Sequence, residues 1–183
     1  MLESVVRTAR LLTNDCVLLG RADRLPDSLK EMQWLPDAYP AIGPIAGLHT
    51  LLTHRPGRWC VLLSCDLPNL TLRTISNLVD HIAPDTRVVA YETSPHPVKK
   101  KPTDRNPWDS NAEPSDPRDV LLEPCCALYH ASILRDVQHA ITDQRYALHD
   151  LIIALPHVAV PIDPETRATL RNINTPGDYN GPL

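Results

Sequence analysis

Apolar residues follow two different spacings along the chain, and stretches of the two kinds alternate. The spacing of three and four residues that marks one face of a helix occurs at residues 3–12, 44–52, 71–82, 131–142 and 147–155. Short apolar runs typical of strands lie between them, at residues 16–20, 33–35, 59–64, 87–91, 121–123, 125–129 and 157–162. Strands separated by helices indicate βαβ units, so the pattern predicts an α/β fold with a mostly parallel sheet.

Two of the expected helices have clear start signals. Pro44 suits the first position of a helix because its ring presets the backbone. Thr71 is a residue type that caps a helix at its amino end. Five apolar residues on one predicted face follow it: Leu72, Ile75, Leu78, Val79 and Ile82. We expect both helices to turn their apolar stripes toward the core.

Neither spacing continues through residues 93–120. This stretch contains six prolines, five basic residues, five acidic residues and no glycine. Such a sequence cannot bury enough apolar surface to offset the entropy of ordering it. We therefore expect a single domain spanning residues 1–183 with a disordered insertion at 93–120.

Composition narrows the classes of function. The chain has 183 residues, 43% of them hydrophobic, which is enough for one core. Its formal net charge of -4 argues against a nucleic-acid surface, which needs a basic excess. No apolar run approaches the roughly 18 residues of a membrane helix, and no secretory signal is recognisable. We expect a soluble cytoplasmic protein without nucleic-acid or membrane contact, whose partners are small molecules or proteins.

The cysteines also limit the possibilities. There are five of them, an odd number without a CxxC pair, so neither a zinc site nor a disulfide framework is expected. Cys16, Cys60 and Cys65 lie in or beside apolar runs, where a buried and unreactive thiol is the common outcome.

Asp66 follows the strongest of the expected strands, at 59–64. Ligands of open α/β sheets bind beyond the carboxyl ends of the strands, and a hard cation on a nucleotide phosphate prefers carboxylate oxygens. Asp66 is therefore a candidate metal ligand. The alternative is an aspartate that caps the turn before Pro68.

Two further segments contain candidate binding residues. Gly43 allows a sharp turn into the helix at Pro44, and Gly47 lets a ligand approach free amides that favour an anion. An ordinary entry into a helix is the alternative. Asn172 and Asn174 share one face of a short extended segment, which suits a polar ligand, although a terminal turn would explain them equally well.

Four segments, in their order and spacing, resemble the molybdenum cofactor guanylyltransferase family, which is a MobA-like group of nucleoside-triphosphate transferases. They are Trp34-Leu-Pro-Asp37 to Pro44-Ile-Ala-Gly47, Leu62-Leu-Ser-Cys-Asp66-Leu-Pro68, Glu123-Pro-Cys-Cys-Ala-Leu-Tyr129 and Asn172-Ile-Asn-Thr-Pro176. The resemblance covers nearly the whole chain outside 93–120. It implies a three-layer, Rossmann-like, mostly parallel sheet of the nucleotide-diphospho-sugar transferase type.

The resemblance also implies a reaction, which is transfer of GMP from GTP to molybdopterin cofactor with release of pyrophosphate. In that reaction Asp66 would be the catalytic residue that holds Mg²⁺. The residues implied for nucleotide binding are Asp37, Gly43 and Gly47, and those implied for the acceptor side are Asn172 and Asn174. The family's role implies possible contact with a molybdoenzyme or a cofactor-biosynthesis protein.

The start of the chain departs from the family pattern. Members begin with a strand and a glycine-rich loop that cradles the triphosphate, and Met1 corresponds to the helix after that loop. The fold is thus expected to be N-terminally incomplete. Because a missing central strand leaves backbone groups unpaired, at about 1–3 kcal/mol for each buried one, we predict a gap beside strand 16–20 or strand 59–64.

This departure leaves two alternatives to the guanylyltransferase. One is a non-catalytic nucleotide-binding or interaction module, a remnant of the same fold. The other is a transferase that uses CTP or a sugar-phosphate acceptor, because the loops that select the base are not identifiable in the sequence.

Overall fold

The computed structural model describes residues 1–21, 25–93 and 121–171. The helices are α1 (Leu2–Leu12), α2 (Pro44–His54), α3 (Leu72–Asp80), α4 (Leu134–Thr142), α5 (Leu148–Ile153) and α6 (Pro164–Thr169). The strands are β1 (Leu18–Leu19), β2 (Trp34–Leu35), β3 (Trp59–Leu63), β4 (Val88–Thr93), β5 (Leu121–His130) and β6 (His157–Pro161). Short 3-10 turns lie at Asp27–Leu29 and Ala131–Ile133.

The strands form two separate sheets within the described residues. Four of them pair in the order β3-β5-β4-β6, and β1 pairs with β2 alone. β4 and β6 are parallel, as are β1 and β2, whereas β5 is antiparallel to both of its neighbours. β3, β4 and β6 therefore share one direction, and β5 alone opposes them.

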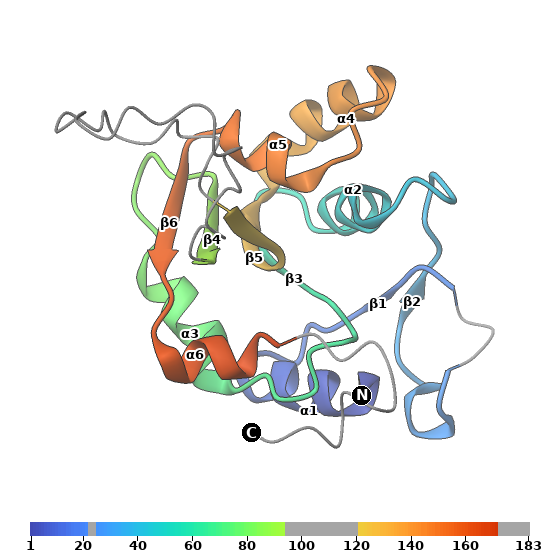
Figure 1. Ribbon diagram of the computed structural model, residues 1–183. Helices are drawn as coiled ribbons and strands as arrows, with labels where there is room; N and C mark the ends of the chain where they lie inside the picture. Colours follow the sequence, from blue (N-terminus) through green and yellow to red (C-terminus); the bar gives the residue numbers. More distant parts are fainter. Residues whose placement is uncertain (22–24, 94–120, 172–183) are drawn as a thin grey trace, which may run out of the picture.

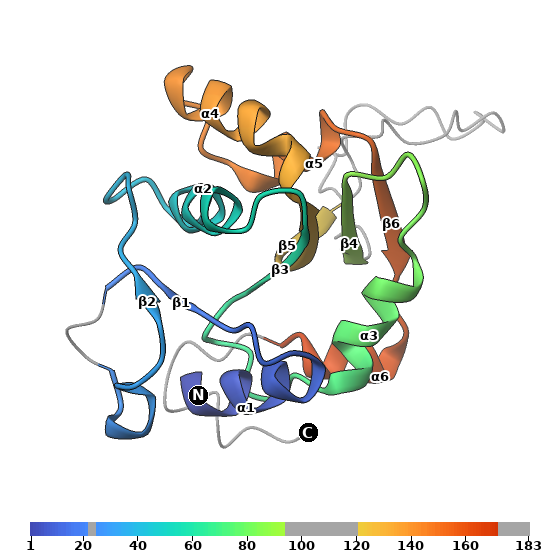
Figure 2. The ribbon, with the colours of Figure 1, turned by 180° about the vertical axis from the view of Figure 1, so that it is seen from behind.

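Helices cover both faces of the four-stranded sheet. Figures 1 and 2 show α2, α4 and α5 on one side and α1, α3 and α6 on the other. A hydrophobic core lies on each face of the sheet. Alternate residues of β4 pack into one core or the other, because successive strand residues point to opposite faces. Val88 packs with Leu48 of α2, and Val89 packs with Ile75 of α3; all four are fully buried. The result is the α/β fold predicted by the alternating pattern, in the three-layer form that the family resemblance implies.

Short-range sequence signals predicted most of the helices and strands correctly. The Thr71 side chain accepts a hydrogen bond from the Thr74 amide at 3.2 Å, so the predicted cap of α3 is present. The predicted stripe of α3 is only partly confirmed, since Leu72 and Val79 are exposed. Being seven residues apart, these two share one margin of the stripe, whereas Ile75 and Leu78 are fully buried.

Three other expectations need correction. The two extended runs at 121–123 and 125–129 form one strand, β5, and its antiparallel direction was not anticipated from a pattern that favours parallel pairing. Helix α6 was not predicted, because its six residues are too few to show a helical stripe. Cys65 is exposed, unlike the buried Cys60, because it lies in the turn after β3 rather than in the strand. All five cysteines are free.

The predicted gap in the sheet is confirmed. β1, the shortened form of the strand expected at 16–20, and β3 belong to different sheets within the described part of the chain. The proposed insertion falls outside the described residues except for Thr93, which ends β4. Asn172 and Asn174 also lie outside them.

Candidate functional site

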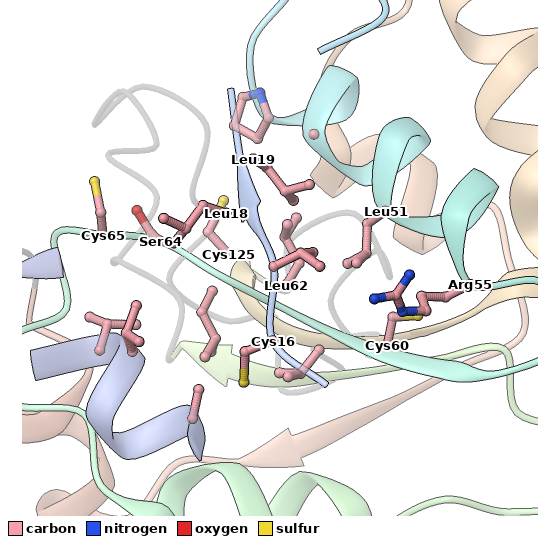
Figure 3. Close-up of a pocket in the computed structure, with 18 of the residues that line it drawn as sticks. Cys16, Leu18, Leu19, Leu51, Arg55, Cys60, Leu62, Ser64, Cys65 and Cys125 are labelled. Atoms are coloured by element: carbon pink, nitrogen blue, oxygen red, sulfur yellow. The ribbon is translucent and has the colours of Figure 1, made fainter. Parts of the chain in front are cut away.

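A cavity of about 780 Å³ lies between β1 and β3. Figure 3 shows Leu18 and Leu19 of β1 and Leu62 of β3 among its lining side chains, with sulfur atoms of several cysteines nearby. Helix α1 adds Val5 and Val6 to the lining, and α2 adds further residues from the other side. The gap between β1 and β3 is thus a cavity lined by both strands and by helices of both layers.

Asp37 lies at the polar end of this cavity, just after β2. Its carboxylate sits over two glycines: a Cβ added at Gly20 would be 3.5 Å from Asp37 Oδ2, and one at Gly47 would be 3.8 Å from Oδ1. Asp37 Oδ1 is buried and receives no hydrogen bond from the described residues. Burial without a compensating donor raises the pKa of Asp37.

The start of α2 lies beside this carboxylate. Gly43 precedes the helix with a φ of 80°, a left-handed conformation that favours glycine, and no side chain caps the helix there. Gly47 in the first turn is buried, and a Cβ there would be 3.6 Å from Leu19 Cδ1. Pro44 has no amide hydrogen, and the Ala46 amide donates to the Gly43 carbonyl at 3.1 Å. This end of the cavity therefore offers an anion the Ile45 amide and the positive end of the helix dipole, beside one carboxylate.

Asp66 lies in the turn after β3, and that turn is tightly held. Leu67 beside it is fully buried. From α1, the Ser4 hydroxyl donates to the Pro68 carbonyl at 2.9 Å, and the Thr8 hydroxyl donates to the Leu70 carbonyl at 3.1 Å. Asp66 Oδ1 is buried and has no hydrogen-bond partner among the described residues. An orphaned buried carboxylate oxygen on a fixed turn suits a cation.

Glu123 on β5 is the acidic neighbour of Asp66, and the sequence reasoning gave it no role. Glu123 Oε1 accepts a hydrogen bond from the Cys125 amide at 3.1 Å. Burial chiefly, and the nearby charge of Asp66 in addition, raise the pKa of Glu123, against the lowering effect of the Cys125 amide. A shift of register in the β4–β5 pairing at Ala90/Tyr91 leaves residues 124–126 without partners on β4, and such bulges often orient side chains at sites. The sequence signal that could have identified Glu123 is a charged residue beside a proline within an otherwise apolar strand.

His49 on α2 is a third buried group whose Nδ1 lacks a partner in the described residues. Burial lowers its pKa, so the imidazole is neutral at physiological pH. Its ring meets that of Tyr39 edge-on, with centroids 5.0 Å apart. His49 therefore packs beneath the loop that carries Asp37 and supports its position.

The structure thus brings together part of the expected site. Asp37, Gly43 and Gly47 line the cavity, and on the β3 side Ser64 and Cys65 line it just before Asp66. Asp66 itself is not among the lining residues. It stands beyond the carboxyl end of β3, where its negative charge contributes to the raised pKa of Glu123 on the neighbouring strand.

The residues present fit a divalent cation only in part. Among the described residues, no three histidine, cysteine, aspartate or glutamate side chains cluster closely enough to hold a metal ion. Asp66 and Glu123 supply two carboxylates, one with an orphaned oxygen. This is the donor set expected for Mg²⁺, which is usually held by one or two carboxylates, with substrate phosphates and water completing the octahedron.

Comparison with known proteins decides the family. A family model described as "MobA-like NTP transferase domain" matches residues 1–158. The chain belongs to this family. A protein of Flavobacterium johnsoniae named "Probable molybdenum cofactor guanylyltransferase" is 22% identical over 148 residues, which are 80% of this chain and 64% of the relative. A relative of the same name from Clostridium perfringens is 29% identical over 66 residues, which are 35% of this chain and 33% of the relative. The MobA-like chain thus spans less than two thirds of either relative.

Solved structures confirm the fold. A protein of Aquifex aeolicus aligns with a TM-score of 0.72 at 21% identity, covering 95% of this chain and 78% of that one. Molybdopterin-guanine dinucleotide biosynthesis protein A of Archaeoglobus fulgidus gives 0.67 at 19% identity, over 96% and 80% of the two chains. A 2-C-methyl-D-erythritol 4-phosphate cytidylyltransferase of Thermus thermophilus gives 0.66 at 15% identity, over 97% and 84%.

None of the described helices has the length and apolar character needed to cross a bilayer.

Proposed function

We propose that the MobA-like domain formed by this chain serves the transfer of a nucleoside monophosphate from a nucleoside triphosphate, GTP, to the terminal phosphate of molybdopterin cofactor, with release of pyrophosphate. An acceptor oxygen attacks the α-phosphorus, and the bond from that phosphorus to the pyrophosphate oxygen breaks. The reaction needs no covalent intermediate, so the protein contributes orientation and electrostatics.

The observation that carries this proposal is the pair of orphaned carboxylate oxygens at the carboxyl ends of strands on the two sides of the cavity. Asp37 Oδ1 follows β2, and Asp66 Oδ1 follows β3. Leaving a buried polar atom unpaired costs about 1–3 kcal/mol. Such a cost is typical of sites where a ligand supplies the missing partner.

Each residue has a separate role in this proposal. Asp66 and Glu123 would hold Mg²⁺, which supplies positive charge to neutralise the phosphates and the departing pyrophosphate. The uncapped start of α2 after Gly43 favours phosphate oxygens, and the Asp37 carboxylate accepts hydrogen bonds from the base or ribose. Asn172 and Asn174 are assigned to the acceptor side on the family resemblance alone.

Nucleotide binding by residues 1–183 is expected to be weak. Only six glycines occur in the chain, and none forms the glycine-rich loop that the family resemblance calls for. Charge-assisted hydrogen bonds contribute roughly 1.5–3 kcal/mol each, so the loss of several lowers triphosphate affinity by orders of magnitude. We therefore expect no measurable guanylyl transfer by residues 1–183 alone.

The test compares residues 1–183 with a chimera in which a family strand and glycine-rich loop precede Met1. Calorimetry should detect tight GTP·Mg²⁺ binding only in the chimera, and transfer is measured as pyrophosphate release. In the chimera, Asp66→Asn should abolish transfer and weaken Mg²⁺-dependent binding while leaving the fold intact, as judged by cooperative unfolding. Asp85→Asn, at an exposed turn before β4, is the matched control and should change nothing. Micromolar GTP·Mg²⁺ binding by the short chain, or unchanged turnover of the Asp66→Asn chimera, would overturn the proposal.

A non-catalytic module is the second candidate, and the interrupted sheet beside the site favours it. Its signature would be a chimera that binds GTP without releasing pyrophosphate. Replacing GTP by CTP in the same assays tests the choice of base, since the cytidylyltransferase of Thermus thermophilus shares the fold.

A further inference from the structure

A buried tyrosine holds the bulge of β5 beside Glu123. Tyr129 is fully buried, and its hydroxyl donates to the Pro124 carbonyl at 2.8 Å. Burial raises the pKa of Tyr129, so the hydroxyl keeps its proton and acts as the donor. Along a straight strand, at about 3.3 Å per residue, these two residues would lie roughly 16 Å apart, which is beyond the reach of one side chain. The hydrogen bond therefore depends on the bulge at residues 124–126, and it holds that bulge in place.

The peptide unit that Tyr129 binds also carries the amide that binds Glu123. The Pro124 carbonyl and the Cys125 amide belong to one planar trans peptide, in which they point in opposite directions. The Cys125 amide donates to Glu123 Oε1 at 3.1 Å. Because the peptide plane is rigid, a hydroxyl that fixes the direction of the carbonyl also fixes the direction of the amide. The two hydrogen bonds also strengthen each other by polarising the peptide between them.

The next peptide unit connects this arrangement to the turn that carries Asp66. The Cys125 carbonyl accepts a hydrogen bond from the Ser64 amide at 2.8 Å, and Ser64 lies two residues before Asp66. Burial first, and the charge of Asp66 in addition, raise the pKa of Glu123, so the two carboxylates are close enough to interact. The pairing of β3 with β5 thus sets the Glu123 carboxylate beside Asp66.

We propose that Tyr129 is a positioning residue, which orients the Glu123 carboxylate beside Asp66 through the Pro124–Cys125 peptide. Tyr129 touches no substrate, since its side chain is enclosed by the core on the α2 side of the sheet. The role rests on the proposed use of Asp66 and Glu123 in holding Mg²⁺. A carboxylate that is already oriented loses less conformational freedom when a cation binds, so Tyr129 increases cation affinity without taking part in the chemistry.

Tyr129→Phe tests the orientation of the peptide directly, because it removes the hydroxyl and keeps the ring that fills the core. In residues 1–183, hydrogen exchange followed by NMR should quicken at least fivefold at the Cys125 amide. The His130 amide on the same strand, which donates to the Arg87 carbonyl at 2.9 Å, should change by less than twofold. This measurement needs neither nucleotide nor metal, so its outcome does not depend on the proposed function.

Tyr91→Phe is the matched control. Tyr91 on β4 is also fully buried, and its hydroxyl donates to the Thr74 carbonyl of α3 at 2.8 Å, on the other side of the sheet. Its loss removes one buried hydrogen bond but should leave exchange of the Cys125 amide unchanged. An unchanged Cys125 amide in Tyr129→Phe would refute the proposal. Equal acceleration in both variants would refute it too, by showing a general loss of stability.

The chimera with the family strand and loop tests the consequence for the site. Tyr129→Phe should raise the Mg²⁺ concentration for half-maximal transfer at least fivefold and leave kcat at saturating Mg²⁺ within twofold. In a Glu123→Ala background the same substitution should have no further effect, because the hydroxyl acts through Glu123. A full additional effect there would refute the proposal. If the chimera transfers no nucleotide, the proposed function fails, while exchange at the Cys125 amide still confirms or refutes the role of Tyr129.

Discussion

Replacing Asp37 by asparagine should stabilise the protein while weakening nucleotide binding. The carboxylate is partly buried over Gly20 and Gly47, and its Oδ1 receives no hydrogen bond from the described residues. Burial raises the pKa of Asp37, so the folded protein holds a proton there more tightly than the unfolded chain does. Asparagine keeps the shape of the side chain and removes the charge that burial disfavours.

The sign of the pH dependence follows from the raised pKa. Below the unfolded pKa of about 3.9 the Asp37 carboxyl is neutral in both states, and its charge costs no stability. As the pH rises through the folded pKa, the buried charge destabilises the folded state. The gain from Asp37→Asn should therefore be full at pH 7 and shrink toward pH 4. An orphaned buried group costs about 1–3 kcal/mol; because Asp37 is only partly buried, we expect about 1 kcal/mol, or about 2–4 °C in Tm for a chain of this length.

Thermal unfolding of the wild-type, Asp37→Asn and Asp85→Asn proteins at pH 4, 5.5 and 7 measures this effect. Asp85 is exposed, so its variant reports any general effect of removing one negative charge. A lower Tm for Asp37→Asn at pH 7, or the same rise at pH 4 and pH 7, would show that the carboxylate is not an uncompensated charge.

Three further predictions concern single positions. Gly20→Ala should cost about 1–2 kcal/mol in urea unfolding, because a φ of 92° strains any residue with a Cβ; an unchanged midpoint would show that the backbone relaxes. Thr71→Ala should cost about 1 kcal/mol through loss of the hydrogen bond from the Thr74 amide, and Thr71→Ser should restore it. Iodoacetamide at pH 8 should modify the exposed Cys65 before Cys125, since burial raises the pKa of Cys125 to about 11. Peptide mapping that shows the reverse order would contradict the described exposures.

Much of the fold was predictable because its signals are local. The stripes of α1 and α2, the apolar run of β3 and the capping residue of α3 each depend on residues within one turn or one strand. Even the interruption of the sheet could be anticipated, because the resemblance identifies a strand that these residues do not contain.

The order and direction of the strands could not be predicted from such local signals. β5 lies between β3 and β4 although it follows both in sequence, and its antiparallel direction depends on contacts between residues 28 to 71 positions apart. The proximity of Asp66 and Glu123 has the same origin, since the bond between the Ser64 amide and the Cys125 carbonyl brings the two segments together. Periodicity carries no information about such pairings, so Glu123 had no role before the structure was known.

The sequence by itself determined most of the helices and strands. It identified Asp66 as a candidate through its position after a predicted strand and Gly43 and Gly47 through theirs at the start of a predicted helix, and the family resemblance added Asp37. Only the tertiary structure decided which of their atoms lack partners, which carboxylates are neighbours, and that a cavity separates β1 from β3. The physical reason is that element type follows from interactions along the chain, whereas burial, charge coupling and unpaired backbone depend on segments that meet only after folding.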